Sequence, residues 1–498
     1  MIRPKMIVGT SSDVGKSTVV SAICRVLSDK GISVAPFKAQ NMALNSAVTE
    51  DGFEIGRAQA AQAFAARTLA TCHMNPILLK PESEQRSQLV LRGEVVGSYS
   101  ASEYQKLKPQ LFEEVVSSYH ELAKSYDLVV LEGAGSPAEI NLLKDELVNL
   151  KLAREIGARA LLVADIDRGG MFAHIFGTLK ILPTELAGLV DGYLINKFRG
   201  DPSLLKPGID QLSSLIDAKA FGLLRYFNGA RFDSEDSLSL PGGKSLNSGA
   251  PLKVGVVAFP HLSNYTDFDP FLTEPFVEVA YLTKKDDIHG CDLVVLPGSK
   301  STIEDLAWLR RTFGTSILRY VEGGGHLLGI CGGYQMLGRE IEDGIESEID
   351  GALGLGLLEV FTKFEKRKLT LTRTGRLIDG GGEVNGYQIH NGRVVRGEGV
   401  SGLFELDESP VRLRFGQYDG VSGTEGARQA NVLGTTLHGV LESDGFRRWL
   451  LQRVALSGDK EYSPGPSYLE LKQDYYDRLA KWFLDATSET TMLKWLAS

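Results

Sequence analysis

Short apolar runs alternate with helical patterns through the first half of the chain. Met6-Ile7-Val8 precedes a segment in which Val19, Val20, Ala22, Ile23, Val26 and Leu27 recur at helical spacing. Such alternation is typical of a parallel sheet with helices on both faces, so it predicts a doubly wound α/β domain over 1–230. The strands that we expect after the first one lie at 32–37, 75–81, 127–131, 159–164 and 192–195.

The pattern restarts after a stretch rich in Ser, Gly, Asp and Pro, which predicts a linker over 231–250. Apolar runs at 253–259, 276–282 and 291–296 then begin a second α/β domain, expected over 251–445. Helical patterns predict a C-terminal helical extension over 446–498. We expect its apolar stripe to pack against the preceding domain, a dimer contact being the alternative; the stripe is Leu471, Tyr475, Leu479 and Trp482.

The first apolar run leads into the stretch Gly9-Thr10-Ser11-Ser12-Asp13-Val14-Gly15-Lys16-Ser17-Thr18. A strand, a glycine-rich turn and a helix that begins at Gly-Lys-Ser form the context of a phosphate-binding loop. Five residues separate Gly9 from Gly15, against four in the usual pattern, which indicates a variant loop of the kind found in small-molecule ligases and ATPases. The residues that we expect to bind the nucleotide are Gly9, Thr10, Asp13, Gly15, Lys16, Ser17 and Thr18. A chance glycine-rich turn is the alternative.

Polar residues follow several other predicted strands, at the sheet edge where open α/β domains bind ligands. Glu132 is the expected second magnesium ligand beside Ser17, and Asn196 is a candidate for reading the nucleotide base. The candidate substrate residues after the second strand are Lys38, Gln40 and Asn41. Arg57, Gln59 and Gln62 are expected either to face the same cleft or to lie on a solvated helix face. Asp165, Asp167 and Arg168 suit magnesium, phosphate or carboxylate binding, with a solvated turn as the alternative.

In the second half an apolar strand runs into Cys331, two glycines and a helix. Glycines allow the tight strand-to-helix turn that presents a nucleophile, and a helix N-terminus with a nearby histidine favours the thiolate. His438, which follows another apolar strand, is the candidate base. We expect Gly332 and Gly298 to contribute oxyanion-binding N–H groups, and Tyr334 and Gln335 to belong to the substrate site. A buried structural cysteine is the alternative.

Composition narrows the classes of partner. The 498-residue chain carries a formal net charge of −9 and no basic run, which argues against nucleic-acid binding. Its four cysteines are widely separated, as expected for a reducing cytoplasm without structural zinc. No apolar run approaches the length of a membrane span, so we expect a cytoplasmic protein without membrane partners.

The motifs together resemble a known family. The Cys331 turn with His438 resembles the flavodoxin-like class I glutamine amidotransferase domain, and the first half resembles the dethiobiotin-synthetase-like ATP-binding domain. With the motifs at 36–42, 131–141, 165–170 and 264–270, the chain resembles the cobyric acid synthase family from Met6 to about Glu442. This implies ATP, Mg²⁺, L-glutamine and a corrinoid substrate, adenosylcobyrinic acid a,c-diamide, whose b, d, e and g carboxylates are amidated through acyl phosphates.

The resemblance leaves alternatives and one departure. The alternatives are a cobyrinic acid a,c-diamide synthase, a cell-wall lipid amidotransferase of the same architecture, and a non-catalytic ATP-switched protein; a homo-oligomer is compatible with all of them. The class I histidine is usually followed two residues later by Glu, but Gly439-Val440 follows His438 here. We therefore expect a Cys–His dyad, with Glu442 as the nearest candidate orienter. His390, in the motif 386–392, is expected to be structural or interfacial rather than catalytic.

Overall fold

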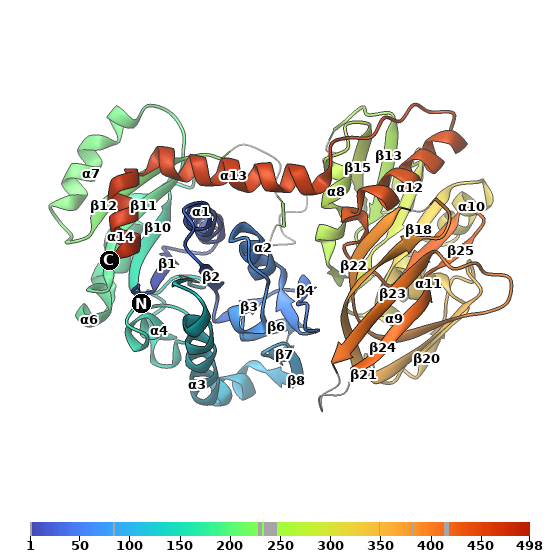
Figure 1. The fold of residues 1–498 in the computed structure, drawn as a ribbon, viewed down its shortest axis with the longest axis horizontal. Helices are drawn as coiled ribbons and strands as arrows, with labels where there is room; N and C mark the ends of the chain where they lie inside the picture. Colours follow the sequence, from blue (N-terminus) through green and yellow to red (C-terminus); the bar gives the residue numbers. More distant parts are fainter. Residues whose placement is uncertain are drawn as a thin grey trace. The chain divides into compact units, whose positions relative to one another are not determined.

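A computed structural model describes residues 2–82, 85–227, 232–233, 247–347, 349–380, 382–412 and 418–498. The chain divides into two compact units (Figure 1). Unit 1 contains Met1–Ala43, Ile55–Gly229 and Lys472–Ser498, and unit 2 contains Leu44–Glu54 and Ala230–Leu471. Most of the expected linker over 231–250 lies outside the described residues, which include only 232–233 and 247–250 of it.

Unit 1 is built on a six-stranded parallel sheet with the strand order β12-β11-β10-β1-β9-β2. Its strands are β1 (Lys5–Gly9), β2 (Val34–Phe37), β9 (Leu128–Glu132), β10 (Arg159–Asp165), β11 (Val190–Phe198) and β12 (Lys219–Arg225). The helices of this part are α1 (Lys16–Asp29), α2 (Arg57–Ala65), α3 (Ala101–Ser125), α4 (Leu150–Glu155), α5 (Met171–Ile181), α6 (Thr184–Ala187) and α7 (Lys206–Ser213). The chain order reverses beside β1, so the phosphate-loop stretch lies where ligands bind in such sheets. The predicted doubly wound α/β fold is confirmed.

A second, smaller sheet in unit 1 has the order β3-β6-β7-β8. Its strands are β3 (Gln40–Met42), β6 (Ile77–Pro81), β7 (Arg86–Leu91) and β8 (Glu94–Ser100). β3 and β6 are parallel, and β6, β7 and β8 are antiparallel neighbours. This sheet carries Gln40 and Asn41, so it fixes two of the candidate substrate residues.

The C-terminal helices α13 (Tyr468–Ala486) and α14 (Glu489–Ala497) correct one expectation. From Lys472 onward they belong to unit 1, not to unit 2, which contains the domain expected over 251–445. The Tyr476 ring lies 5.6 Å from that of Phe64 on α2, and fully buried Arg25 on α1 donates to Gln473 at 2.9 Å. The final residue is also anchored, because Lys5 Nζ donates to the Ser498 carbonyl at 2.9 Å, and Figure 1 places the two chain ends together.

Unit 2 contains a six-stranded sheet with the order β15-β13-β16-β18-β26-β25. Its strands are β13 (Leu252–Val257), β15 (Val277–Leu282), β16 (Leu293–Leu296), β18 (His326–Ile330), β26 (Val432–Thr435) and β25 (Ala427–Gln429), of which only β25 is antiparallel. Successive residues of β16 enter two different core clusters, because neighbouring strand residues point to opposite faces. The helices are α8 (Asp269–Leu272), α9 (Thr302–Phe313), α10 (Ser316–Glu322), α11 (Gly332–Leu337) and α12 (Asp444–Ser457).

Residues 340–425 form a further sheet that the hydrophobic pattern did not predict. It has the order β20-β19-β21-β23-β24, with β22 also paired to β21. Its strands are β19 (Glu340–Glu342), β20 (Gly351–Leu353), β21 (Val360–Leu377), β22 (Glu383–Arg396), β23 (Phe404–Arg412) and β24 (Tyr418–Glu425). β22 matters for the site, because Tyr387 and His438 pair across an isolated bridge.

Unit 2 also holds a segment from the N-terminal part of the sequence. Within Leu44–Glu54, β4 (Ser46–Val48) leads toward β5 (Glu54–Gly56), which returns the chain to unit 1. Ser46 N–H donates to Asn264 Oδ1 at 2.9 Å, and Tyr265 N–H donates to Asn45 Oδ1 at 3.1 Å. These reciprocal bonds tie the 264–270 motif to this segment. Two-residue β14 (Leu262–Ser263) and β17 (Gly298–Ser299) pair nearby. Among the described residues, no helix is long and apolar enough to cross a membrane.

Candidate active sites

Cys331 occupies the predicted turn between β18 and α11. Its φ is +51°, a backbone conformation that side chains other than glycine seldom adopt and that is concentrated at functional sites. A Cβ on Gly332 would lie 3.0 Å from Ser299 N, and one on Gly333 would lie 2.0 Å from the Leu296 carbonyl oxygen. The two glycines are therefore required by close backbone packing, and the turn holds Cys331 almost completely buried.

His438 follows β26 and is oriented by a residue that the sequence did not reveal. Its Nδ1 lies 2.7 Å from Asp267 Oδ2, and the Gly439 N–H donates to Asp267 Oδ1 at 2.8 Å. The imidazole stacks on Tyr387, with ring centroids 5.5 Å apart and planes at 24°. Asp267 takes Nδ1, so the other ring nitrogen is left for a different partner. The Cys331 side chain is close enough to influence the pKa of His438.

The electrostatic balance at His438 favours its charged form. Burial by itself lowers the pKa of His438, but the negative charge of Asp267 and then that of the Cys331 thiolate outweigh burial and raise it to about 10. A protonated imidazole beside a thiolate is the form in which a cysteine attacks a carbonyl and the histidine protonates the leaving group.

The remaining candidates in unit 2 have different surroundings. Asp267, not Glu442, contacts His438 Nδ1, so the expected dyad has a third member. A Cβ on Gly298 would lie 2.8 Å from His438 Cε1, so this glycine keeps space beside the imidazole. Tyr334 is a core residue: it is 1% exposed, and burial raises the pKa of its hydroxyl. Gln335, also buried, lies beside Gly392 on β22.

A second carboxylate, that of half-buried Glu425, shapes the loop that carries His438. Glu425 accepts hydrogen bonds from the Thr435 hydroxyl at 2.7 Å and from the Thr436 N–H at 2.7 Å. Burial raises the pKa of Glu425, while these donors oppose the rise. Gln388 on β22 donates to the Thr436 hydroxyl at 2.7 Å. The loop is thus held from β24 and β22 just before His438.

In unit 1 the phosphate loop runs from the end of β1 into α1. Gly15 caps α1 with φ +98°, and a Cβ there would lie 2.2 Å from Asn196 Nδ2, so only glycine fits. Lys16 Nζ donates to the Ser11 carbonyl at 2.9 Å and to the Gly135 carbonyl at 3.1 Å. Thr10 N–H donates to the Val163 carbonyl, and Thr18 lies in the first turn of α1.

Glu132, at the end of β9, is buried among three donors. Ser17 Oγ donates to Oε1 at 2.8 Å, Lys38 Nζ lies 3.0 Å from Oε1, and Gln62 Nε2 donates to Oε2 at 2.5 Å. Gln59 in turn accepts from Asn41 Nδ2 at 3.2 Å. The structure therefore confirms that Gln59 and Gln62 of α2 face this cluster rather than solvent. Gln40 lies at its margin, where it accepts a hydrogen bond from the Tyr104 hydroxyl at 2.6 Å.

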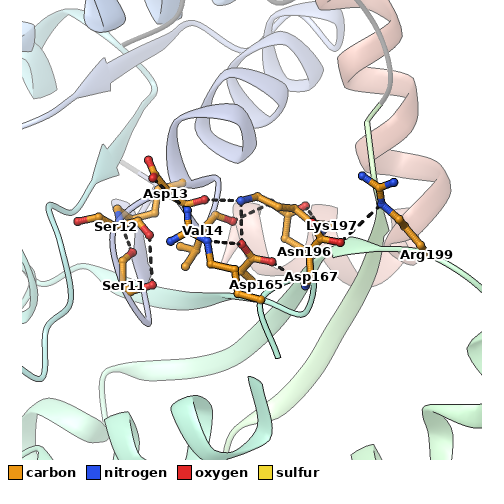
Figure 2. Close-up of polar contacts among 11 residues, drawn as sticks. Ser11, Ser12, Asp13, Val14, Asp165, Asp167, Asn196, Lys197 and Arg199 are labelled. Atoms are coloured by element: carbon orange, nitrogen blue, oxygen red, sulfur yellow. Dashed lines mark hydrogen bonds and ion pairs between the residues drawn. The ribbon is translucent and has the colours of Figure 1, made fainter. Parts of the chain in front are cut away.

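Figure 2 shows a second set of contacts that supports the loop. Asn196 Nδ2 donates to the Val14 carbonyl at 2.8 Å, which places this amide on the loop backbone. Lys197 bridges the Asp13 carbonyl at 2.6 Å and Asp165 Oδ2 at 2.7 Å. Arg168 also pairs with the Asp13 carboxylate at 3.1 Å. Asp165 and Arg168 are thus partly engaged in holding the phosphate loop.

The described residues contain no group of three or more His, Cys, Asp or Glu side chains that could hold a metal by themselves. Mg²⁺ bound with a nucleotide has a smaller requirement, because it keeps waters and phosphate oxygens and takes only one or two protein ligands. The Ser17 hydroxyl and the Glu132 carboxylate, 2.8 Å apart, are oxygen donors of the kind that Mg²⁺ prefers. These two residues fit the ion.

The geometry and the comparisons define a class. Residues 253–446 match the family described as a CobB/CobQ-like glutamine amidotransferase domain, and residues 5–237 match the CobQ/CobB/MinD/ParA nucleotide binding domain. A cysteine turn with its histidine in one unit and a phosphate loop in the other thus make this chain a nucleotide-binding, glutamine-dependent amidotransferase.

Full-length relatives narrow the class further. The chain is 42% identical to a cobyric acid synthase of Sorangium cellulosum, over 95% of each chain. It is 43% identical to one of Syntrophobacter fumaroxidans, over 96% of this chain and 95% of the relative. A third, of Streptomyces coelicolor, is 45% identical over 95% of this chain and 92% of the relative. The chain belongs to the cobyric acid synthase family.

Proposed function

We propose that this enzyme amidates peripheral carboxylates of a corrinoid, taking nitrogen from L-glutamine and activating each carboxylate with ATP. The observation that carries the proposal is the presence in one chain of two complementary sites. One site has a buried cysteine near a histidine that Asp267 orients, and the other has a phosphate loop beside a buried Glu132. The names of the relatives support the corrinoid as substrate.

In the glutaminase reaction, the Cys331 thiolate attacks the side-chain carbonyl carbon of glutamine. The carbonyl oxygen becomes negative, and N–H groups near Gly332 and Gly298 are the candidate donors that stabilise it. His438 gives its proton to the amide nitrogen, so the C–N bond breaks, ammonia leaves and a thioester remains. A water, deprotonated by the now neutral His438, hydrolyses the thioester to glutamate and regenerates Cys331.

In the synthetase reaction, a carboxylate of the corrinoid attacks the γ-phosphorus of ATP, and ADP leaves. Lys16 and the N–H groups at the start of α1 would compensate the negative charge of the phosphates. Mg²⁺, which Ser17 and Glu132 would hold, would add positive charge beside the phosphates. Ammonia then attacks the acyl phosphate, inorganic phosphate leaves, and an amide is formed.

The two half-reactions need each other for a chemical reason. A carboxylate is a poor electrophile until it is phosphorylated, and free ammonia is mostly protonated at neutral pH, as amines with a pKa near that of lysine, about 10.4, are. Release of neutral ammonia inside the protein supplies a nucleophile that bulk solution at pH 7 provides only sparingly. This division of labour accounts for a glutaminase and a phosphate loop in one chain.

Mass spectrometry of the products tests the proposal. The enzyme is incubated with adenosylcobyrinic acid a,c-diamide, ATP, Mg²⁺ and L-glutamine, and we expect four successive conversions of carboxylate to amide, at the b, d, e and g positions. Omission of ATP or of glutamine should leave the substrate unchanged. A product with a single new amide, or no product at all, would contradict the assignment.

A further inference from the structure

His390 on β22 is a buried histidine with one unused nitrogen. It is 7% exposed, and its Nδ1 lies 2.6 Å from the Gly392 carbonyl oxygen. A carbonyl oxygen only accepts hydrogen bonds, so Nδ1 carries the proton and, in the neutral ring, Nε2 carries the lone pair. Nε2 is buried and has no hydrogen-bond partner. A buried acceptor without a donor is uncommon in native proteins and calls for a ligand or a function.

The neighbours of His390 belong to the glutaminase site. Gln388, two residues earlier and on the same face of β22, bonds to Thr436, which is two residues before His438. On the other side, a Cβ on Gly392 would lie 2.5 Å from Nε2 of Gln335, four residues after Cys331. His390 therefore lies between the two segments that carry the reacting side chains.

A second unused polar atom lies by the same glycine. The Thr362 hydroxyl on β21 is buried without a hydrogen-bond partner, and its Cγ2 would be 2.9 Å from a Cβ on Gly392. Two buried polar atoms without hydrogen-bond partners, His390 Nε2 and the Thr362 hydroxyl, thus belong to residues around Gly392.

Burial and nearby positive charges keep His390 neutral. Burial first, then the positive charge of Arg393, and also those of His438 and Lys368, lower the pKa of His390 to about 3, although its bond to the Gly392 carbonyl opposes this. A neutral imidazole accepts a hydrogen bond but has no proton on Nε2 to donate.

We propose that Nε2 of His390 accepts a hydrogen bond from the ammonia released at Cys331 and holds this nitrogen inside the protein. The inference rests on the proposed glutaminase reaction and adds the residue that receives the product of that reaction. No bond is made or broken at His390. Its effect is on whether released nitrogen becomes an amide or escapes to solvent.

The test is the coupling ratio, the amount of glutamate formed per amide formed, in His390→Leu. We expect a ratio near one in the wild type and a several-fold rise in the variant, with free ammonia detected by a scavenging dehydrogenase. Glutaminase turnover and amidation driven by added ammonium chloride should stay within about twofold. His390→Gln, which offers an amide oxygen as acceptor, should return the ratio toward the wild-type value.

His326→Leu is the matched control. His326 is also buried, uses one ring nitrogen on Ser457 at 2.9 Å and leaves the other unpartnered, but it lies at the start of β18, at the opposite end from Cys331. Its coupling ratio should not change. If His390→Leu does not fold, His390→Met and His390→Gln provide the same comparison.

Two results would overturn the inference: an unchanged coupling ratio, or glutaminase and amidation falling together at a constant ratio, which would make His390 structural. Failure of the proposed function would look different: the wild-type enzyme would then form no amide with either glutamine or ammonium chloride.

Discussion

At the scale of single residues, the glutaminase site depends on a carboxylate that fixes an imidazole. Asp267 binds His438 Nδ1 with one oxygen and the next backbone N–H with the other, so it sets both the tautomer of the ring and its direction. It also supplies the largest charge that raises the pKa of His438 to about 10, against the effect of burial. Proton delivery to the leaving nitrogen depends on that charge.

We therefore expect Asp267→Asn to impair the glutaminase reaction without unfolding the protein. Loss of the carboxylate favours the wrong tautomer, which in a related triad costs on the order of 10⁴-fold in kcat. It also lowers the pKa of His438, so the imidazolium is lost at a lower pH and the alkaline limb of kcat/KM for glutamine shifts to lower pH. A pH series of glutaminase rates measures both effects.

The control for this variant lies in the same motif. Asp269 accepts a hydrogen bond from Asp233 N–H at 3.1 Å, whereas the carboxylate bonded to His438 Nδ1 is that of Asp267. Asp269→Asn should keep the wild-type rate and pH profile. Equal loss in the two variants, or an unshifted alkaline limb in Asp267→Asn, would remove the orienting role from Asp267.

Sequence patterns located Cys331 and His438 because each follows an apolar strand and is flanked by glycine. They did not locate Asp267, which lies on the 3-10 turn Tyr265–Phe268 and is 171 residues from His438 in sequence. Nothing in local periodicity encodes such a pair. The 264–270 motif was a signal that this turn matters, but not for which chemistry. The Glu132 cluster was easier to predict from the sequence, because polar residues that follow parallel strands converge at one edge of the sheet.

At the scale of elements, the C-terminal helix shows why an amphipathic pattern does not identify its partner. The pattern correctly predicted a helix, and Tyr475 and Leu479 of the predicted stripe are buried, whereas Leu471 and Trp482 are half-buried. Tyr476 and Phe483 complete the buried face of α13. It could not tell which unit covers that face, because periodicity records burial and not the neighbour. Arg25 on α1, fully buried beneath α13 and bonded to Gln473, shows that this part of the helix completes unit 1.

We expect Tyr476→Ala to destabilise unit 1. Large-to-small changes of buried aromatic residues cost about 3–5 kcal/mol, which for a unit of this size lowers the transition temperature by roughly 10 °C. Calorimetry resolves the effect if the two units melt separately, because a bound nucleotide shifts only the transition of the unit that binds it. The exposed Leu469 near the start of the same helix gives the control Leu469→Ala, which should be neutral. If Tyr476→Ala instead lowered the transition temperature of unit 2, the helix would pack against unit 2, as the sequence had predicted.

At the scale of the whole molecule, the enzyme joins two chemistries that can be tested one at a time. In the proposed function, the glutaminase site needs glutamine and water, and the synthetase site needs ATP, Mg²⁺, a carboxylate and ammonia from any source. In each unit the reacting groups follow strands of that unit's own parallel sheet. They follow β18 and β26 in unit 2, and β1 and β9 in unit 1. Variants at the two sites should therefore differ in how they respond to added ammonia.

Cys331→Ala should abolish amidation with glutamine, because no thioester can form, and leave amidation with ammonium chloride near the wild-type rate. Lys16→Ala should lower amidation with both nitrogen sources, on the order of 10²–10³-fold, because the phosphates lose a buried cation. Cys291→Ala, at a buried cysteine outside the nucleophile turn, is the control and should keep both activities. Rates of amide formation under the two nitrogen sources give the result. Loss of ammonia-driven activity in Cys331→Ala would show that Cys331 acts beyond glutamine hydrolysis, and full activity in Lys16→Ala would refute the phosphate-binding role of the loop.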